Sequence, residues 1–240
     1  HKWVYRWSAA RAEGKLAQWV AALLQRKALS ILESLSQKLS SVEEELGLTL
    51  NDQQRKAVLT AVCHPMTILT GGPGTGKTLT QKALLALYKK LHPQNTVQCC
   101  APTGRAARRM EESTGVEAAT IHKVLKLLAG EDGTYSEPEP MEADLVLVDE
   151  VSMLDIYLAE NLFRSLKQGC QVVLVGDADQ LPSVGPGAVL REMLACGQIP
   201  VVRLTKIYRQ DADSHIAMNA ALIRAGNLHL EYGNDFQFIE

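Results

Sequence analysis

Short apolar runs alternate with longer amphipathic stretches over most of this 240-residue chain. The apolar runs predict strands at residues 66–70, 96–101, 144–149, 171–176 and 201–204. The amphipathic stretches predict helices at residues 52–63, 77–91, 103–113, 154–167 and 187–195. Because strands that alternate with helices join as βαβ units, the pattern predicts an α/β fold built on a parallel sheet.

The first 46 residues show helical periodicity without a strand. Apolar side chains recur at helical spacing in two groups, Leu16, Val20, Leu23 and Leu24, then Leu29, Leu32, Leu35 and Leu39. We expect these stripes to pack against a core or a neighbouring domain rather than against a partner helix. Residues 1–46 are therefore predicted to be a helical segment. A second unit over residues 47–240 opens with Asn51 as a candidate helix N-cap.

Composition excludes several classes of protein. The net charge is -2, so no overall attraction draws the chain to nucleic acid, and such contact needs a local basic patch. No apolar run approaches the roughly 18–20 residues of a membrane span, and no signal peptide is visible, so we expect a cytoplasmic protein. The five cysteines show no C-x-x-C spacing, which favours reduced thiols over a metal site.

The first predicted strand runs directly into a phosphate-binding pattern. Residues 66–78 read MTILTGGPGTGKT, and Gly71-x-x-x-x-Gly76-Lys77-Thr78 matches the phosphate-binding loop. Glycines let backbone N–H groups approach phosphates, and the following helix adds its positive N-terminal end. Lys77 supplies charge to the β- and γ-phosphates, and the Thr78 hydroxyl binds Mg²⁺. The residues expected to bind nucleotide are Gly72, Pro73, Gly74, Thr75, Gly76, Lys77, Thr78 and Leu79.

Another predicted strand ends in two carboxylates, since residues 145–150 read LVLVDE. Asp149 can hold the same Mg²⁺, and Glu150 can activate water. The carboxyl ends of parallel strands meet at one edge of a sheet, so both motifs are expected there, together with Thr103 and Asp177. The two motifs predict an enzyme that binds and hydrolyses ATP or GTP.

An ordered set of further motifs narrows this prediction to one family. The chain carries LNDQQRKAV (50–58), APTGRAARRM (101–110), ATIHKVL (119–125), VLVDEVSMLD (146–155), VVLVGDADQLPSVGPG (172–187) and LTKIYRQ (204–210). Over about residues 47–240 this set resembles the first motor domain of a superfamily 1 helicase, and most closely the RecD-like 5′→3′ branch. Residues 1–46 weakly resemble the tail of the domain that precedes that motor.

The resemblance implies a fold, a reaction and partners. The implied fold is a RecA-like, parallel-sheet P-loop NTPase domain. The implied reaction is ATP-dependent 5′→3′ helicase or translocase action on single-stranded DNA in repair or recombination, and its polarity rests on the resemblance alone. The implied cofactors are ATP and Mg²⁺, and the implied partners are single-stranded DNA and nuclease or repair-complex subunits.

The resemblance also assigns roles outside the two nucleotide motifs. Gln54 would pair with adenine, because its amide offers both a donor and an acceptor, and this favours ATP over GTP. Gln180 would sense the γ-phosphate and couple it to the DNA site. Arg209 would reach the γ-phosphate and stabilise charge during phosphoryl transfer. The catalytic set is then Lys77, Asp149, Glu150, Gln180 and Arg209.

The implied DNA contacts lie on two turns, each at the start of a helix. Such a turn offers backbone N–H groups and a hydroxyl to a phosphate. Aromatic residues make up only 5% of the chain, so base stacking is limited. The densest positive stretch of the chain is formed by Arg105, Arg108, Arg109, Lys123 and Lys126. The residues expected to bind DNA are Pro102, Thr103, Gly104, Arg105, His122 and Lys123.

Residues 129–142, AGEDGTYSEPEPME, differ in composition from their surroundings. Asp132-Gly133 is a strong hairpin-turn signal, so the segment is either a surface loop or a small β-hairpin insertion. RecD-like helicases carry a short duplex-splitting hairpin at this place. The glutamates and prolines of this segment argue against a tight DNA contact here.

Nothing after residue 210 resembles the second motor domain, with its own arginine finger, that such helicases need. Residues 213–226 instead read as a helix with Ile216, Ala220 and Ile223 on one face. The chain starts at His1 and stops in DFQFIE, so we expect a fragment of a longer protein. Such a fragment would bind nucleotide, hydrolyse it slowly and unwind nothing alone.

Two other functions remain open on the sequence. One is a non-catalytic, nucleotide-gated module of a repair complex. The presence of Lys77, Asp149, Glu150 and Arg209 argues against it, because an inactive module does not need all four. The other is the helicase part of a conjugative relaxase, which a relaxase domain upstream would decide.

Overall fold

The computed structural model describes residues 6–29, 33–128, 136–206, 215–224, 226–227 and 229–237. The chain divides into two compact units, His1–Thr205 and Lys206–Glu240. The helical segment at the N-terminus belongs to the same unit as the sheet. The domain boundary that the sequence places near residue 47 stays a prediction.

The first unit is built on a six-stranded parallel sheet with the order β3-β2-β4-β5-β1-β6. Its strands are β1 (Met66–Gly71), β2 (Val97–Ala101), β3 (Ala118–Thr120), β4 (Leu145–Val148), β5 (Gln171–Gly176) and β6 (Val201–Leu204). All five predicted strands are confirmed. The sixth, β3, was not predicted, because its three half-buried residues are too few to show a strand pattern.

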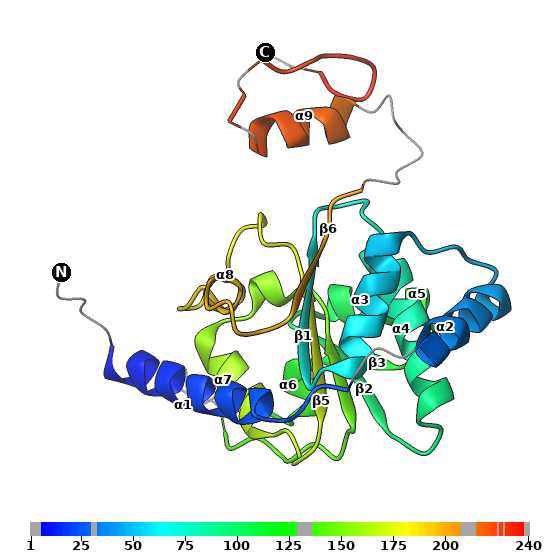
Figure 1. Cartoon of the computed structure of the whole chain (residues 1–240). Coiled ribbons are helices and arrows are strands. Elements are labelled where there is room, and N and C mark those ends of the chain that lie inside the picture. The colour runs from blue at the N-terminus through cyan, green and yellow to red at the C-terminus, as the bar shows by residue number, and fades with distance from the viewer. Residues whose placement is uncertain are drawn as a thin grey trace. The chain divides into compact units, whose positions relative to one another are not determined.

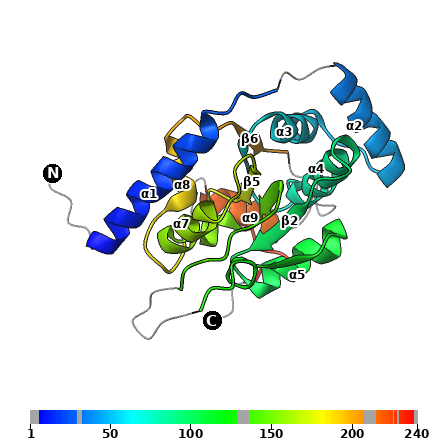
Figure 2. The ribbon, with the colours of Figure 1, turned by 90° about the horizontal axis from the view of Figure 1, so that it is seen from below.

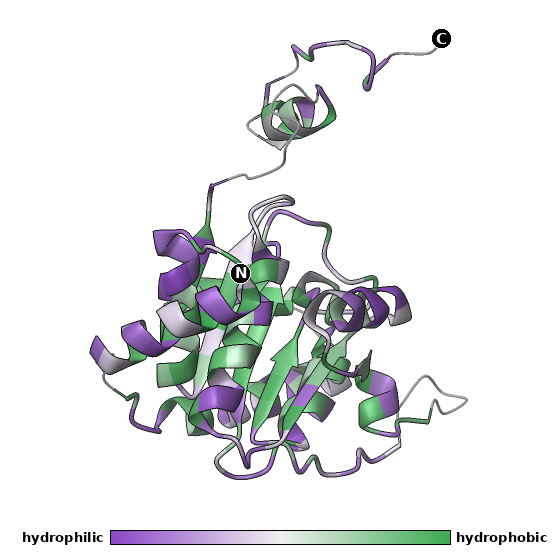
Figure 3. Cartoon of the chain, turned by 90° about the vertical axis from the view of Figure 1, so that its right-hand side faces the viewer, coloured by the Kyte–Doolittle hydropathy of each residue, from purple (hydrophilic) through white to green (hydrophobic). Residues whose placement is uncertain are grey.

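Helices cover both faces of the sheet (Figures 1 and 2). One face carries α1 (Trp7–Leu24), α6 (Ile121–Val124), α7 (Ile156–Arg164) and α8 (Val189–Ala195). The other carries α2 (Glu33–Leu46), α3 (Asp52–Cys63), α4 (Lys77–Leu91) and α5 (Gly104–Thr114). Figure 3 shows the apolar strands enclosed between these layers. Because helices bury both faces of the sheet, the strands appear in the sequence as unbroken apolar runs.

Successive strand residues point to opposite layers, as the pleat requires. Ile68 packs in the cluster with α1 and α7, whereas Leu69 packs in the cluster with α3 and α4. Cys100 and Cys99 divide between the two clusters in the same way. Burial raises the pKa of the Cys99 thiol to about 12, so this thiol stays protonated and packs as a small apolar group.

The N-terminal stripes are confirmed in part. Leu16 of α1 and Leu39 of α2 are buried against the two faces of the sheet. The prediction for Leu29 was wrong, because this side chain is 64% exposed. Leu29 lies on the extended segment after α1, where its N–H donates to the Cys63 carbonyl at 2.7 Å. Leu32 lies outside the described residues.

Helix ends differ from the predicted ranges by a few residues. The predicted helix 154–167 is the shorter α7, because a 3₁₀ turn over Val151–Met153 precedes it and Asp155 caps it. The Asp155 carboxylate accepts from the N–H groups of Tyr157 and Leu158 at 2.9 and 2.8 Å. Capping of this kind fixes where a helix begins more sharply than hydrophobic periodicity does.

The hairpin turn predicted at Asp132-Gly133 lies outside the described residues. At the base of this segment, the Ser136 N–H donates to the Leu128 carbonyl at 2.9 Å. Met141 then makes an isolated parallel bridge to Leu166. Residues 136–142 form no named strand.

The second unit contains α9 (His215–Arg224), which lies within the predicted helix 213–226, and residues 213, 214 and 225 of that prediction lie outside the described residues. The Asn219 amide is fully buried, donating to the Glu231 carbonyl and accepting from the Glu231 N–H at 2.8 Å. Ile216 and Ile223 are exposed on the helix surface. Over the described residues of both units, no helix is long and apolar enough to cross a bilayer.

Candidate nucleotide and nucleic-acid site

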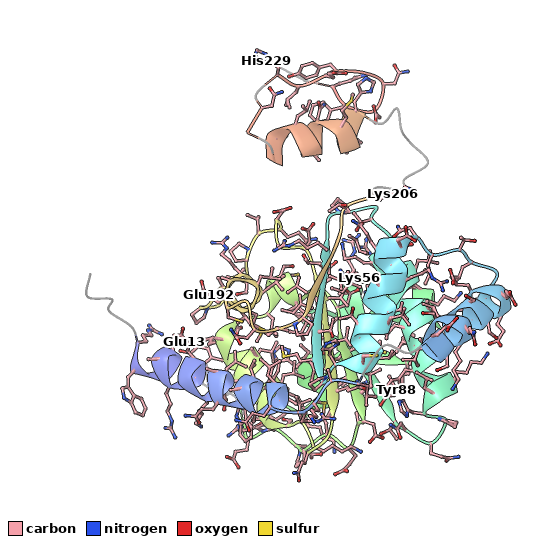
Figure 4. The ribbon with its side chains drawn as sticks, viewed as in Figure 1. Glu13, Lys56, Tyr88, Glu192, Lys206 and His229 are labelled. Atoms are coloured by element: carbon pink, nitrogen blue, oxygen red, sulfur yellow. The ribbon has the colours of Figure 1, made fainter. Side chains whose placement is uncertain are left out.

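The phosphate loop, residues 71–78, connects β1 to α4 at the carboxyl edge of the sheet. Helix α4 then returns to the other edge, where Tyr88 lies (Figure 4). Gly74 and Gly76 adopt left-handed conformations, with φ of 75° and 83°. Gly76 is the N-cap of α4, and no side chain caps this helix start. The first N–H groups of α4 therefore face outward as donors for an anion.

The loop leaves no space for side chains at two of its glycines. A Cβ on Gly76 would lie 2.2 Å from the Gln54 Nε2. A Cβ on Gly71 would lie 2.7 Å from the Thr75 Oγ1 and 2.8 Å from the Leu204 carbonyl oxygen. The Gly71 contact includes backbone that cannot shift cheaply, whereas Gly76 is favoured as glycine mainly by its left-handed φ of 83°.

Lys77 places its charge over the loop. Its Nζ donates to the Gly71 and Gly72 carbonyls at 2.7 and 3.1 Å. The Thr75 hydroxyl donates to the Gly72 carbonyl at 2.8 Å and keeps the loop curved. A concave loop with uncapped N–H groups and an ammonium group fits a multiply charged phosphate. Thr78 lies exposed in the first turn of α4.

The two acidic residues follow β4 at the same edge. The Asp149 N–H donates to the Cys100 carbonyl at 3.0 Å, which extends the β2–β4 pairing by one bond. Asp149 Oδ1 then accepts from the Glu150 N–H at 2.9 Å. Glu150 has a φ of 53°, a left-handed conformation that a residue with a Cβ adopts at some cost. Such strain commonly marks residues that act in chemistry.

The surroundings of Glu150 raise the pKa of its carboxyl group. Burial is the main cause, and the neighbouring Asp149 carboxylate adds to it. Lys77 and Arg109 lower the pKa by a smaller amount, and Asp177 raises it. A carboxylate with a raised pKa accepts a proton more readily than an exposed one, as a general base requires.

The strand order brings the third element to the same place, because β5 lies between β4 and β1. Asp177, directly after β5, is 4% exposed and accepts from the Asp179 N–H at 3.0 Å. The Gln180 Oε1 accepts from the Ser152 hydroxyl at 2.9 Å. Gln180 is thereby joined to the turn that follows Glu150. The sequence did not single out Ser152, although it lies within the quoted motif VLVDEVSMLD.

Gln54 is buried beneath the loop. Its side chain is 2% exposed, its Oε1 accepts from the Asn51 N–H at 2.9 Å, and its Nε2 donates to the Thr75 carbonyl at 3.4 Å. The adjacent Gln53 points elsewhere, where its amide bonds Thr205. The Gln54 amide keeps one donor hydrogen and one lone pair, so adenine pairing stays a prediction.

Two threonines cap the helices on the predicted DNA side. Thr103 Oγ1 accepts from the Ala106 N–H at 3.2 Å, and Thr120 Oγ1 accepts from the Lys123 N–H at 3.2 Å. The two turns are neighbours, because β2 and β3 are paired through Ala101 and Thr120. Thr120 was missed by the sequence interpretation, although its role repeats that of Thr103.

The predicted DNA residues gather around these turns. Gly104, Arg105 and Lys123 are exposed, whereas the remaining members of the set, Pro102, Thr103 and His122, are half-buried. Lys126 pairs with Glu139 at 2.7 Å, so its charge is partly compensated. The structure therefore brings the six predicted DNA residues to the edge that also carries the phosphate loop.

One predicted site residue, Arg209, lies outside the described residues. Thr78 and Asp149, the predicted Mg²⁺ ligands, offer a hydroxyl and a carboxylate, the oxygen donors that this ion prefers. Among the described residues there is no group of three or more His, Cys, Asp or Glu side chains that could hold a metal alone.

Comparison with known sequences supports the family resemblance that the motifs predict. A protein-family model described as AAA domain matches residues 49–239. The ATP-dependent RecD2 DNA helicase of Deinococcus radiodurans is 39% identical over 212 residues, covering 88% of this chain and 28% of the relative. The RecBCD enzyme subunit RecD of Haemophilus influenzae is 38% identical over 165 residues, covering 59% and 26%. The chain thus spans little more than a quarter of these relatives.

Comparison with solved structures supports the fold. The crystal structure of Pif1 helicase from Candida albicans superposes with a TM-score of 0.56 at 22% identity, covering 76% of this chain and 45% of that one. The Pif1 helicase from Bacteroides in complex with ADP-AlF3 and ssDNA gives 0.54 at 21% identity, covering 76% and 48%. At such identities the likeness shows the fold alone, which is that of an α/β P-loop NTPase.

Proposed function

Because the chain belongs to the AAA domain family and is a RecD-like superfamily 1 motor domain, we propose that it drives an ATP-dependent DNA helicase. The helicase moves in the 5′→3′ direction along single-stranded DNA in repair or recombination. The direction and the single-stranded substrate come from the resemblance alone, and the name of the Deinococcus radiodurans relative supports DNA helicase action. A second motor domain of the same protein completes the nucleotide site.

One observation supports this proposal: the phosphate loop, the acidic pair and two turns with exposed cationic side chains lie at the carboxyl ends of neighbouring strands, on one edge of the sheet. The phosphate loop follows β1, the acidic pair follows β4, and the two threonine-capped turns follow β2 and β3. The order β3-β2-β4-β5-β1 puts the acidic pair between the DNA turns and the loop. A simple nucleotide-binding enzyme has no need of the two cationic turns.

The residues divide the work by their chemistry. The phosphate loop and Lys77 would hold ATP, with Thr78 and Asp149 holding Mg²⁺, which neutralises phosphate charge. Glu150 would take a proton from the attacking water, and its raised pKa suits that task. Gln180 would sense the γ-phosphate, Gln54 would contact adenine, and Arg209 would stabilise charge at the γ-phosphate.

The DNA side would bind the sugar–phosphate backbone rather than the bases. The turns at Thr103 and Thr120 supply backbone donors, and Arg105 and Lys123 supply charge. Such contacts carry no sequence preference, as translocation requires. We place the protein in the cytoplasm, with nuclease or repair-complex subunits as further partners.

The test is anisotropy of a fluorescent single-stranded oligonucleotide with this chain, at low and high salt, with and without a non-hydrolysable MgATP analogue. We expect salt-sensitive binding that shifts with nucleotide. Arg105→Ala should weaken DNA binding, and Lys77→Ala should remove the nucleotide effect. A chain that binds nucleotide without any DNA would contradict the DNA role given to this domain and favour a nucleotide-gated module.

A further inference from the structure

Helix α2 is fixed to α3 by one arginine. The Arg55 guanidinium on α3 pairs with Glu43 on α2 and donates to the Ser36 carbonyl and the Ser40 hydroxyl, both at 3.2 Å. Glu43 is 9% exposed. A nearly buried carboxylate needs such partners, because water does not replace them.

The second oxygen of Glu43 holds the chain just before α3. It accepts from the Leu50 N–H at 2.7 Å, and Leu50 itself is buried. The next residue, Asn51, forms a reciprocal capping box with Gln54, with both bonds at 2.9 Å. Glu43 therefore fixes the turn whose geometry decides where the Gln54 side chain lies.

From this turn the contacts reach the phosphate loop. The Gln54 Nε2 donates to the Thr75 carbonyl at 3.4 Å and lies where a Cβ of Gly76 would be. The path from α2 to the loop thus runs through Glu43, Leu50, Asn51 and Gln54. Its members are buried or partly buried, which strengthens each bond relative to a surface bond.

We propose that α2 is part of the nucleotide site, with Glu43 and Arg55 as positioning residues that hold the Asn51–Gln54 turn against the phosphate loop. This rests on the proposed nucleotide binding and adds a determinant of affinity outside the recognised motifs. A loop held in place before the nucleotide arrives loses less conformational freedom on binding. This clamp, the Glu43–Arg55 pair, positions the phosphate loop and also Gln54, the residue proposed to contact adenine, so it changes affinity for both ATP and GTP and changes that for ATP more.

The packing of α2 supports this role. Leu39 and Val42 of α2 lie in the same apolar cluster as Val58 of α3 and Leu84 of α4. Figures 1 and 2 show α2 alongside these two helices, which flank the phosphate loop. Helix α2 therefore packs against both α3, whose Gln54 contacts the loop, and α4, which begins at the end of the loop.

The same helix supplies a matched control. Glu45 lies two residues beyond Glu43 and pairs with Lys90 at 2.5 Å, near the end of α4 that is remote from the loop. Its side chain is 61% exposed. Glu45→Gln removes the same charge from the same helix without touching the path to the loop. Exposed pairs of this kind contribute little to stability.

The experiment titrates fluorescent ATP and GTP analogues into this chain and into three variants, Glu43→Gln, Arg55→Lys and Glu45→Gln. We expect Glu43→Gln to raise the dissociation constant for ATP about 3- to 10-fold and that for GTP by a smaller factor, because only ATP uses the Gln54 contact. Arg55→Lys should change both in the same direction, because one ammonium cannot span Glu43, Ser36 and Ser40. Glu45→Gln should change neither by more than about 1.5-fold.

Circular dichroism and thermal melting check that each variant is folded at the titration temperature. A folded Glu43→Gln with unchanged dissociation constants would overturn the inference, as would an equal change in Glu45→Gln. If Glu43→Gln does not fold, Arg55→Lys decides by the same criterion. Failure of the unmodified chain to bind either nucleotide would instead refute the proposed function, which separates the two failures.

Discussion

Two strand-to-helix junctions at one edge of the sheet begin their helices differently. The junction from β1 to α4 ends in Gly76, left-handed and without a side-chain cap. The junction from β2 to α5 ends in Thr103, extended, with its hydroxyl accepting from the Ala106 N–H. The first leaves its helix donors outward for an anion, whereas the second already satisfies one of them.

The difference matches the two ligands in the proposed function. A nucleotide must be held through hydrolysis, so a loop of free donors with a lysine suits it. A DNA phosphate must be released at every step, so a partly satisfied turn with a weaker grip suits it. The comparison predicts that substitutions at the first junction act on nucleotide and that substitutions at the second act on DNA.

The largest effect is expected at Lys77, whose ammonium lies over the loop carbonyls. Lys77→Ala should lower DNA-stimulated ATP hydrolysis by roughly 100-fold or more, because a charge aimed at the transferred phosphoryl group is lost. Phosphate release by the protein that carries both motor domains measures it. The matched variant Lys123→Ala should weaken DNA binding while nucleotide affinity stays unchanged. Loss of nucleotide affinity in Lys123→Ala would contradict the division of the two junctions between nucleotide and DNA.

Next comes the pH dependence of hydrolysis. Burial and the Asp149 carboxylate raise the pKa of Glu150, and the base acts in its deprotonated form. The rate should therefore fall, as pH decreases, at a higher pH than an ordinary glutamate would give. Arg109 lowers this pKa, so Arg109→Ala should move the acidic limb to still higher pH. Single-turnover rates of hydrolysis between about pH 5 and 9 give the pH at which the rate falls on the acidic side. If Arg109→Ala left that pH unchanged, Arg109 would not act on Glu150.

The two junctions also differ in their glycines, Gly76 and Gly104, and the free energy of unfolding tests this difference. Gly76 is left-handed and packs on the Gln54 amide, whereas Gly104 is helical and its added Cβ would meet only Thr120 Cγ2 at 4.0 Å. Gly76→Ala should lower the free energy of unfolding by about 1–3 kcal/mol. Gly104→Ala should be neutral or raise it by up to about 1 kcal/mol. Urea unfolding measures both, and equal losses would contradict the conformational argument.

The sequence was sufficient for the parts of the fold and site that are local in the chain. Strands β1 and β5 are buried on both faces, so each appears as an unbroken apolar run. The phosphate loop and Asp149 follow such runs directly, and this order alone predicts that they meet at one edge. Asn51 carries its capping signal within four residues.

The features that the sequence did not predict depend on contacts between segments that are distant along the chain. Strand β3 is three half-buried residues, and its extended form comes from pairing with Cys99–Ala101 of β2. The burial of Gln54 depends on Thr75, 21 residues away. The Glu43–Arg55 clamp joins two helices, and in the sequence each of these two residues looks like an ordinary solvated charge. Periodicity reports which face of an element is apolar, and it does not report which polar side chains meet.

The smallest expected effect lies at the caps of the DNA junction. Thr103→Ala removes the acceptor for the Ala106 N–H and should cost about 1 kcal/mol of stability, together with part of the DNA affinity. Thr103→Ser keeps the hydroxyl and should preserve both. Nucleotide affinity should stay constant in both variants, because the loop makes no contact through this cap. Urea unfolding and oligonucleotide anisotropy give the two readouts. If Thr103→Ala lost DNA affinity without losing stability, the hydroxyl would serve DNA directly rather than the helix start, and the two junctions would differ less than their caps indicate.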